Sequence, residues 1–313
     1  MADSYVYHGN DGFLEAVGPR LAAAGFERVA DEAEASLIVS FCTSATHLED
    51  LYFGEDGVIQ RAPKGAVLVD LSAATPNFAR EMNAVATLSD CVMMEAPFVL
   101  RDLTAADGLG RDNLACYVAG EQEDPTAKRF LEALFGVVKP VGAPGSGQLL
   151  RAARTLQATA YLLAVIEADA LYRAQQRSVA GSGVDEAMLG GESEGAAAII
   201  AAVREGRFEG SYTAEMLMAS LASAIMAADD AELIMPQAES ALHLLELLCV
   251  IGGADKAPAA LALVYGDESA GAEAGLDWER AEQVYAGSSA EDELDGYDDL
   301  GDDYDAGFDY SSN

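Results

Sequence analysis

Basic residues are scarce in this chain of 313 residues, which has 18 lysines and arginines against 53 acidic residues. The formal net charge of −35 argues against nucleic acid and anionic membranes as partners, because both are bound through clustered lysine and arginine. Lysine occurs only at Lys64, Lys128, Lys139 and Lys256. Chemistry that needs a lysine therefore has few positions at which to occur.

Cysteine and histidine are also sparse, with 4 cysteines and 3 histidines. The cysteines form no Cys-x-x-Cys pair and no two histidines have a helical or hairpin spacing, so the sequence predicts neither a disulfide framework nor a metal site. No run approaches the ~18 apolar residues of a membrane helix. The first residues lack the basic start and apolar run of an export signal. We therefore expect a cytoplasmic protein.

Apolar runs alternate with helical patterns up to residue 145. Thr75 before Pro76 and Asp124 before Pro125 have the composition of helix starts, with a cap followed by proline at the first helical position. This alternation predicts a Rossmann-like α/β domain over residues 1–145, built on a doubly wound parallel sheet. The strand-like runs are "YVYHG", "ASLIVSFC", "GAVLVDLSA", "CVMMEAPFV", "LACYVAG" and "VVKPVG".

The pattern after residue 145 is helical and opens with a run of roughly thirty residues. Further helical stretches are expected over 194–205, 214–229, 236–249 and 257–265, which together predict an all-α domain over residues 146–268. Residues 269–313 are expected to form a largely disordered acidic tail, with a short docking helix near Trp278. From Gly287 to Asn313 the chain has ten acidic residues and no basic one, too polar a composition to bury a core.

Several stretches, taken in order, resemble the β-hydroxyacid dehydrogenase family, which includes 3-hydroxyisobutyrate dehydrogenase and tartronate semialdehyde reductase. "LIVSFCTSATHLEDLYFGEDGVIQRAPKGAVLVDLSAATPNFARE" is similar to the family's run of strand, helix, G-x-x-G, V-D-x-S strand and proline. "EAPF" stands where the family has D-A-P-V-S-G-G, and "GAPGSGQLLRAARTLQ" stands where it has G-x-G-x-x-x-K-x-x-x-N. The resemblance implies a 6-phosphogluconate dehydrogenase-like architecture that binds NAD or NADP and transfers hydride.

The cofactor motif departs from the family's pattern. In "HGNDGFLEAVG" the three family glycines fall on Gly9, Asp11 and Leu14, and a carboxylate at Asp11 repels phosphate. The family's second strand and helix, where the adenosine ribose is read, have no room before the next strand. We therefore expect a shortened Rossmann domain with this strand–helix unit missing, and Gly9, Gly12 and Ser72 as what is left of the cofactor site.

The catalytic and substrate motifs are altered too. The family's lysine and asparagine fall on Arg151 and Thr155, and a guanidinium cannot cycle a proton as an ammonium does. The polar S-G-G loop is replaced by "VLR", which ends at Arg101. Arg101 and Arg154, together with Arg151, are candidate anion-binding residues, because a guanidinium can hold a carboxylate through two hydrogen bonds. Ion pairs with neighbouring acids are the open alternative for each arginine.

Two hypotheses of function follow. In the first, the chain is a pseudoenzyme or a scaffold for a small anion such as a carboxylate, without cofactor or metal. This scaffold forms a homodimer through its α-domain, and its acidic tail offers a contact for a basic protein. In the second, it is an active oxidoreductase that uses NAD or NADP, similar to a hydroxyacid dehydrogenase or an imine reductase. Its rebuilt site then uses Asp169 or Tyr172 in place of the lysine.

Overall fold

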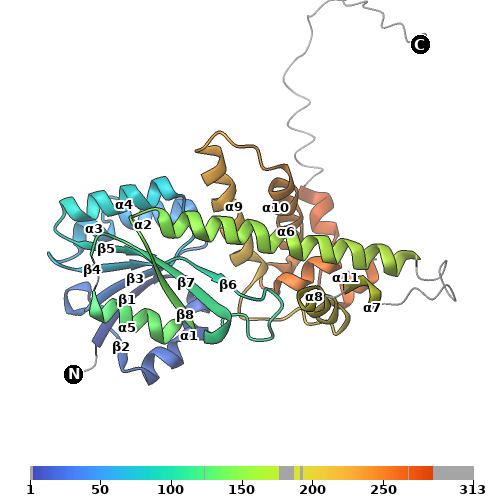
Figure 1. Cartoon of the computed structure of the whole chain (residues 1–313), viewed down its shortest axis with the longest axis horizontal. Helices are drawn as coiled ribbons and strands as arrows, with labels where there is room; N and C mark the ends of the chain where they lie inside the picture. The colour runs from blue at the N-terminus through green and yellow to red at the C-terminus, as the bar shows by residue number, and fades with distance from the viewer. Residues whose placement is uncertain (1–2, 123, 176–186, 191–192, 267, 285–313) are drawn as a thin grey trace, which may run out of the picture.

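A computed structural model describes residues 3–122, 124–175, 187–190, 193–266 and 268–284. The first half of the chain forms α/β layers and the second half is helical, and one long helix runs from the first half across the second (Figure 1). The predicted fold class, a Rossmann-like part followed by an all-α part, is confirmed. Of the predicted acidic tail, residues 269–313, the structure describes 269–284, where Leu276 and Ala281 are buried in the main apolar cluster. Residues from 285 onward lie outside the described residues.

Within the described residues, the α/β half contains one sheet of 8 strands in the order β2-β1-β3-β4-β5-β7-β6, with β8 beside β7. Neighbouring strands from β2 to β5 are parallel, as the alternating pattern predicts. Their carboxyl ends therefore meet at one edge, where open α/β sheets bind ligands. The strands are β1 (Asp3–Gly9), β2 (Phe26–Arg28), β3 (Leu37–Phe41), β4 (Val67–Asp70), β5 (Val92–Glu95), β6 (Phe98–Leu100), β7 (Leu114–Ala119) and β8 (Val137–Gly142).

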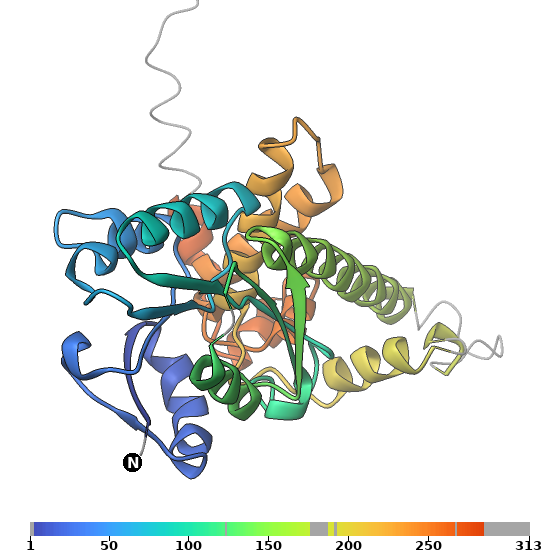
Figure 2. The ribbon, with the colours of Figure 1, turned by 60° about the vertical axis from the view of Figure 1, so that its left-hand side comes forward.

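Helices cover both faces of this sheet (Figure 2). The predicted caps are confirmed, because Thr75 accepts a hydrogen bond from the Phe78 N–H and Asp124 accepts one from the Ala127 N–H. Successive strand residues point to opposite faces, so each face has its own apolar cluster. One cluster includes α1 (Asp11–Ala23) and α5 (Pro125–Leu134), and the other includes α2 (Ala45–Phe53), α3 (Val58–Arg61) and α4 (Pro76–Leu88).

Two details of the predicted sheet are wrong. The second strand is shortened rather than missing, because Phe26 is buried against the edge of Phe130 and holds β2 parallel to β1. Only its helix is lost, replaced by the 3-10 turn Glu32–Glu34. The sheet is also not wholly parallel. β7 runs antiparallel to β5 and β6, since the link from β6 contains only the 3-10 turn Arg111–Asn113 and no crossover helix.

The helical half begins with α6 (Ser146–Gln175), which is ~45 Å long at about 1.5 Å per residue. Its first turns contact the sheet, and it also packs against α8, α9 and α10. The helix predicted over 257–265 is a 3-10 helix, Pro258–Leu263, that begins at a proline. The remaining helices are α7 (Ala187–Gly190), α8 (Glu194–Arg204), α9 (Ala214–Asp229), α10 (Pro236–Leu248), the π-helical turn Cys249–Gly253 and α11 (Glu268–Glu273).

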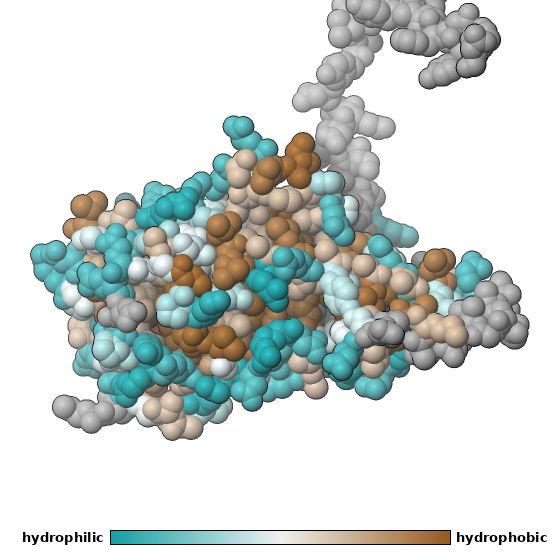
Figure 3. Space-filling view, viewed as in Figure 1, coloured by the Kyte–Doolittle hydropathy of each residue, from teal (hydrophilic) through white to brown (hydrophobic). Residues whose placement is uncertain are grey.

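The surface seen in Figure 3 carries apolar patches around the middle of the molecule, where α6 crosses, with hydrophilic patches beside them. No helix among the described residues combines the length and hydropathy needed to cross a bilayer. The described part of the chain also contains no group of three or more His, Cys, Asp or Glu side chains placed to hold a metal ion.

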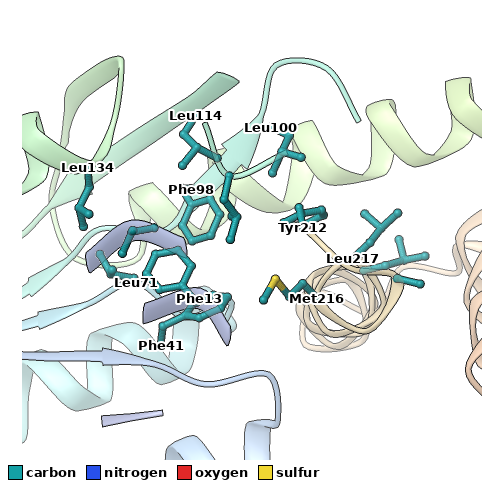
Figure 4. Packing of buried hydrophobic residues seen from close by; sticks show 14 of the residues in the cluster. Phe13, Phe41, Leu71, Phe98, Leu100, Leu114, Leu134, Tyr212, Met216 and Leu217 are labelled. Atoms are coloured by element: carbon teal, nitrogen blue, oxygen red, sulfur yellow. The ribbon is translucent and has the colours of Figure 1, made fainter. Parts of the chain in front are cut away.

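The main apolar cluster extends from the sheet into the helical half. Phe13, Phe41 and Phe98 lie ring against ring, with centroids 4.5, 5.6 and 5.4 Å apart. Tyr212 and Met216 continue this packing toward α9 (Figure 4). Because one core crosses residue 145, the division into domains 1–145 and 146–268 stays a prediction.

Candidate functional site

The turn after β1 is shaped by packing. Gly9 has a φ of +122°, and a Cβ there would lie 2.0 Å from the Phe41 carbonyl oxygen, so the close approach of β3 requires this glycine. Gly12 is exposed, and a Cβ there would meet one side-chain oxygen at 3.4 Å. Asp11 is exposed in the first turn of α1, while Leu14 is buried in the apolar cluster. Asp11 thus stands where the family's glycine lets the backbone approach the pyrophosphate, and Leu14 stands where its glycine lets helix and strand pack closely.

A carboxylate of the chain itself lies beside this turn. Glu32, in the 3-10 turn after β2, has Oε1 at 3.0 Å from His8 Nε2 and at 2.7 Å from Arg61 Nη2. Its side chain is only 13% exposed. Burial lowers the pKa of His8, against the opposing effect of Glu32. Glu32 therefore lies near the edge at which doubly wound sheets bind nucleotides, and its charge is paired with Arg61.

Arg151, at the family's lysine position, is buried with 1% of its surface exposed. Its Nε donates to Gln148 Oε1 at 2.9 Å, and its Nη1 donates to the Ser220 carbonyl and hydroxyl oxygens at 2.7 and 2.9 Å. Its Nη2 donates to the Ala74 carbonyl at 3.2 Å and to Ser223 Oγ at 3.0 Å. All of these acceptors are neutral, so the expected alternative of an ion pair is wrong here. Burial lowers the pKa of Arg151 to about 10, which leaves it protonated at neutral pH.

The space beside Arg151 is nearly filled by side chains, and we call this region the closed junction. The cavity there has a volume of about 20 Å³, enough for about one water molecule. Thr155 is also buried, with its Oγ1 at 3.0 Å from Ser220 Oγ. The predicted catalytic pair therefore lies in the core, and a nicotinamide ring with a substrate exceeds the space beside it. The cavity lining includes Phe41, Leu71, Phe98, Tyr212, Met216 and Ala219, several of which are labelled in Figure 4.

Ser72 belongs to a buried polar row that our sequence reasoning missed. Its Oγ donates to Asp70 Oδ1 at 2.6 Å and accepts from the Cys42 N–H at 2.9 Å, so it ties strand ends together. Asp70 and Glu95 lie in register on β4 and β5, and both are buried. Burial raises the pKa of both carboxyls, that of Glu95 to about 7. An acid inside an apolar strand run is the sequence signal that marks both positions.

Glu95 anchors the start of α6. Its Oε1 accepts hydrogen bonds from the backbone N–H groups of Gly145 and Gly147 at 2.8 and 2.9 Å. A Cβ on Gly147 would lie 2.6 Å from the Tyr117 carbonyl oxygen, so the helix needs glycine to approach the sheet this closely. The second carboxyl oxygen of Glu95 is buried and has no hydrogen-bond partner among the described residues. The carboxyl therefore serves the junction between the sheet and α6.

The two remaining candidates, Arg101 and Arg154, line one open cleft of about 550 Å³ between the segment after β6, the middle of α6 and the start of α8. Both side chains are exposed. Arg101 Nη1 donates to the Asp112 carbonyl at 3.1 Å, and Arg154 Nη1 donates to Gln157 Oε1 at 3.2 Å. Within the described residues neither arginine pairs with a carboxylate, so the predicted alternative is not found for them either. The structure brings these two candidates together and separates both from Arg151.

Residues 11–136 match the family model described as the NAD binding domain of 6-phosphogluconate dehydrogenase. A probable mitochondrial 3-hydroxyisobutyrate dehydrogenase of Dictyostelium discoideum is 29% identical over 136 residues, which cover 43% of this chain and 41% of that protein. The mouse mitochondrial 3-hydroxyisobutyrate dehydrogenase is 30% identical over 138 residues, which cover 44% of this chain and 38% of that protein. Over less than half of its length, the chain is therefore similar to β-hydroxyacid dehydrogenases.

The sequence match spans less than half the length of these curated β-hydroxyacid dehydrogenases, while the likeness of fold extends further. A 3-hydroxyisobutyrate dehydrogenase structure from Salmonella typhimurium has a TM-score of 0.60 and 17% identity, covering 84% of this chain and 100% of that one. A Mycobacterium tuberculosis 3-hydroxyisobutyrate dehydrogenase structure with L-serine has a TM-score of 0.59 at 17% identity, covering 85% and 100%. At this identity the likeness shows that the two-part fold is shared.

Proposed function

We propose that this chain does not transfer hydride and instead serves as a scaffold that binds a small organic anion. The observation that carries the proposal is the closed junction around Arg151. A cavity of about 20 Å³ cannot hold a nicotinamide ring beside a substrate. The buried guanidinium stays protonated and donates its N–H groups to neutral acceptors, so it cannot act as a general base.

The surroundings of the first turn support the same proposal. Asp11 places a carboxylate in the first turn of α1, and the Glu32 carboxylate lies at the adjoining edge of β1. A dinucleotide pyrophosphate at this turn would meet the Asp11 charge, and like charges repel each other. The Glu32 charge is paired with Arg61. Leu14 fills the position at which glycine lets helix and strand close on the cofactor. We therefore propose that neither NAD nor NADP binds with the affinity of a cofactor.

An active oxidoreductase that uses NAD or NADP is the alternative, and the dehydrogenase names of the relatives favour it. The replacement acids on α6 do not support it. Asp169 is 1% exposed and pairs with Arg173 at 2.8 Å and Arg204 at 2.7 Å. It also lies ~27 Å along α6 from Arg151, at about 1.5 Å per residue. Tyr172 lies almost one turn further on, where the Arg204 guanidinium covers its ring at 6.0 Å.

Calorimetric titration of the full chain with NAD and NADP tests the proposal. We expect no binding heat up to millimolar cofactor, and a dissociation constant in the micromolar range for either cofactor would overturn the proposal. A double variant, Arg151→Lys with Thr155→Asn, restores the family's catalytic pair. If only these side chains were missing, the variant would oxidise hydroxyacids in the presence of either cofactor. The closed junction predicts that it does not.

We also propose that the helical half carries a homodimer contact. Leu233 and Ile234, between α9 and α10, are 53% and 84% exposed, and Met226 at the end of α9 is 45% exposed. Clustered exposed apolar side chains mark protein interfaces. Analytical ultracentrifugation should show a dimer for the natural chain and a monomer for Ile234→Asp, and a monomeric natural chain would refute the contact. The proposed basic partner of the acidic tail concerns residues outside the described part.

A further inference from the structure

The open cleft is built from three elements that are distant in the sequence. Leu100 to Leu103 form one wall, the middle of α6 forms the floor, and the first turn of α8 forms the other wall. Its volume of about 550 Å³ falls in the range of sites for small organic molecules, which is about 300–1,000 Å³. Figure 1 shows β6, α6 and α8 converging on this part of the molecule. The cleft is therefore large enough for a ligand that has an apolar group as well as a charged group.

Within the described residues its two arginines form no ion pair with a carboxylate, although the chain has a net charge of −35. Arg20, Arg80 and Arg151 also donate to neutral oxygens. Arg101 and Arg154 each donate one hydrogen bond to a neutral oxygen within the described residues. A guanidinium has five N–H donors, so most of theirs stay available to a ligand. Ion pairs with carboxylates are formed instead by Arg61, Arg111, Arg129, Arg173, Arg204, Arg207 and Arg280.

Two acids in the cleft limit the charge of the ligand. Asp102 is engaged locally, because its Oδ1 accepts from the Thr104 N–H and hydroxyl, both at 2.8 Å. Glu194 lies in the first turn of α8, where a carboxylate is stabilised by the helix dipole. Both still contribute negative charge, and together they balance the two arginines. A singly charged anion therefore suits the cleft better than a phosphate or a dicarboxylate.

Most of the remaining lining is apolar, and Gln157 is its uncharged polar member. Leu100, Leu103, Leu162 and Ile199 contribute aliphatic side chains, and the half-exposed ring of Tyr161 lies among them. An apolar ligand body gains free energy by covering this surface, at about 25 cal/mol per Å² buried. Acetate has almost no such body, and a phenyl or branched-chain acid has one. The lining thus favours an amphipathic ligand over a small hydrophilic one.

We propose that the cleft binds a monocarboxylic acid with an apolar or aromatic body. Its carboxylate is held by Arg101 and Arg154, and its body packs against the leucines and Tyr161. This inference rests on the proposed anion-binding function and adds the site and the class of ligand. Guanidinium–carboxylate pairs are often bidentate, so the two arginines fix the orientation of the acid as well as its charge.

Calorimetry on the full chain with phenylacetate, acetate and inorganic phosphate as probes, at constant ionic strength, tests the proposal. We expect phenylacetate to bind at least tenfold more tightly than either other probe. Arg101→Ala and Arg154→Ala should each weaken phenylacetate at least tenfold. The matched control is Arg28→Ala, which removes an exposed arginine on β2 and should leave binding unchanged. Equal weakening by the control, or phosphate as the tightest probe, would overturn the proposal.

A blocking variant tests the apolar part independently. Ala198 is half-buried in the α8 wall, so Ala198→Phe places a ring inside the cleft. We expect it to abolish phenylacetate binding, and undiminished binding would rule out this cleft. The outcomes also separate the two proposals. If phenylacetate binds equally well to both arginine variants, the chain still binds an anion, but at another site. If NAD binds with micromolar affinity, the proposed function is wrong whatever the cleft binds.

Discussion

Two arginines one helical turn apart on α6 occupy opposite environments. Arg151 is buried in a closed junction and donates to four residues of the sheet side, α6 and α9. Arg154 is exposed on an open cleft and donates to one neighbouring side chain. From the sequence, both were anion-binding candidates on the same face of the helix. The difference teaches that the neighbours of a guanidinium, more than its position in a motif, decide whether it can meet a ligand.

The largest expected effect on stability comes from removing the guanidinium of Arg151 from the closed junction. Arg151→Met keeps much of the volume but removes every donor, and it takes from the buried oxygens of Ala74 and Ser223 the donor that Arg151 gives them. Since one unpaired buried polar group costs about 1–3 kcal/mol, we expect the free energy of unfolding to fall by at least about 2 kcal/mol. Urea denaturation measures this. A loss below about 1 kcal/mol would mean that the junction does not depend on the arginine.

The sequence predicts those parts of the fold that follow from local patterns. Alternating apolar runs give the buried strands, and α9 begins and ends at the expected residues. Thr75 and Asp124 cap their helices because a cap is decided within a few residues. The sequence does not predict the strand Phe26–Arg28, because three residues are too few to show an alternating apolar pattern. This strand depends on its pairing with β1. The antiparallel return of β7 likewise depends on how a short link folds back.

The candidate site is less predictable, because its contacts join residues distant in the sequence. Sequence spacing identifies Arg101 and Arg154 as candidates, but nothing local indicates that they share a cleft. The pairing of His8 with Glu32 and the bonds from Gly145 to Glu95 also arise only when the strands align. A buried acid in an apolar run can be recognised from the sequence, whereas its partner cannot.

The pH dependence of stability tests the buried junction at a second residue, through the variant Glu95→Gln. Burial raises the pKa of Glu95 from 4.5 to about 7, so the folded state binds this proton more tightly than the unfolded state. The natural chain therefore loses stability as pH rises from 4.5 to about 7. The shift corresponds to up to about 3 kcal/mol at 1.36 kcal/mol per pKa unit. Glutamine keeps an oxygen acceptor for Gly145 and Gly147 but does not titrate.

We therefore expect the stability of Glu95→Gln, relative to the natural chain, to increase between pH 5 and pH 8. Urea unfolding of both proteins at the two values measures it. His8 titrates in both proteins, so the difference reports on Glu95 together with its neighbour Asp70, whose charge also raises the Glu95 pKa. A constant difference across this range would show that the Glu95 carboxyl has an ordinary pKa and that its burial does not destabilise the charged form.

A smaller effect is expected at the edge of β1. Glu32→Gln removes the charge that pairs with His8 and Arg61, and partly exposed ion pairs contribute up to about 1 kcal/mol. Glu32 raises the pKa of His8, so the variant should show a lower His8 pKa in a proton NMR titration. The control is Glu34→Gln, which removes an exposed charge two residues away. An unchanged His8 titration would mean that the pair does not form in solution.

The smallest effect on stability is expected from Arg154→Ala, although its side chain lies three residues from Arg151. Arg154 is exposed and donates one hydrogen bond, to the exposed side chain of Gln157, so its removal leaves no buried group unpaired. Exposed substitutions of this kind usually change the free energy of unfolding by less than about 0.5 kcal/mol. Urea denaturation of Arg154→Ala and Arg151→Met under the same conditions compares two positions one turn apart on the same helix. If Arg154→Ala cost as much as Arg151→Met, the open cleft would be part of the structural junction. If Arg154→Ala leaves the free energy of unfolding unchanged but abolishes phenylacetate binding, Arg154 contributes to ligand binding and not to the stability of the fold.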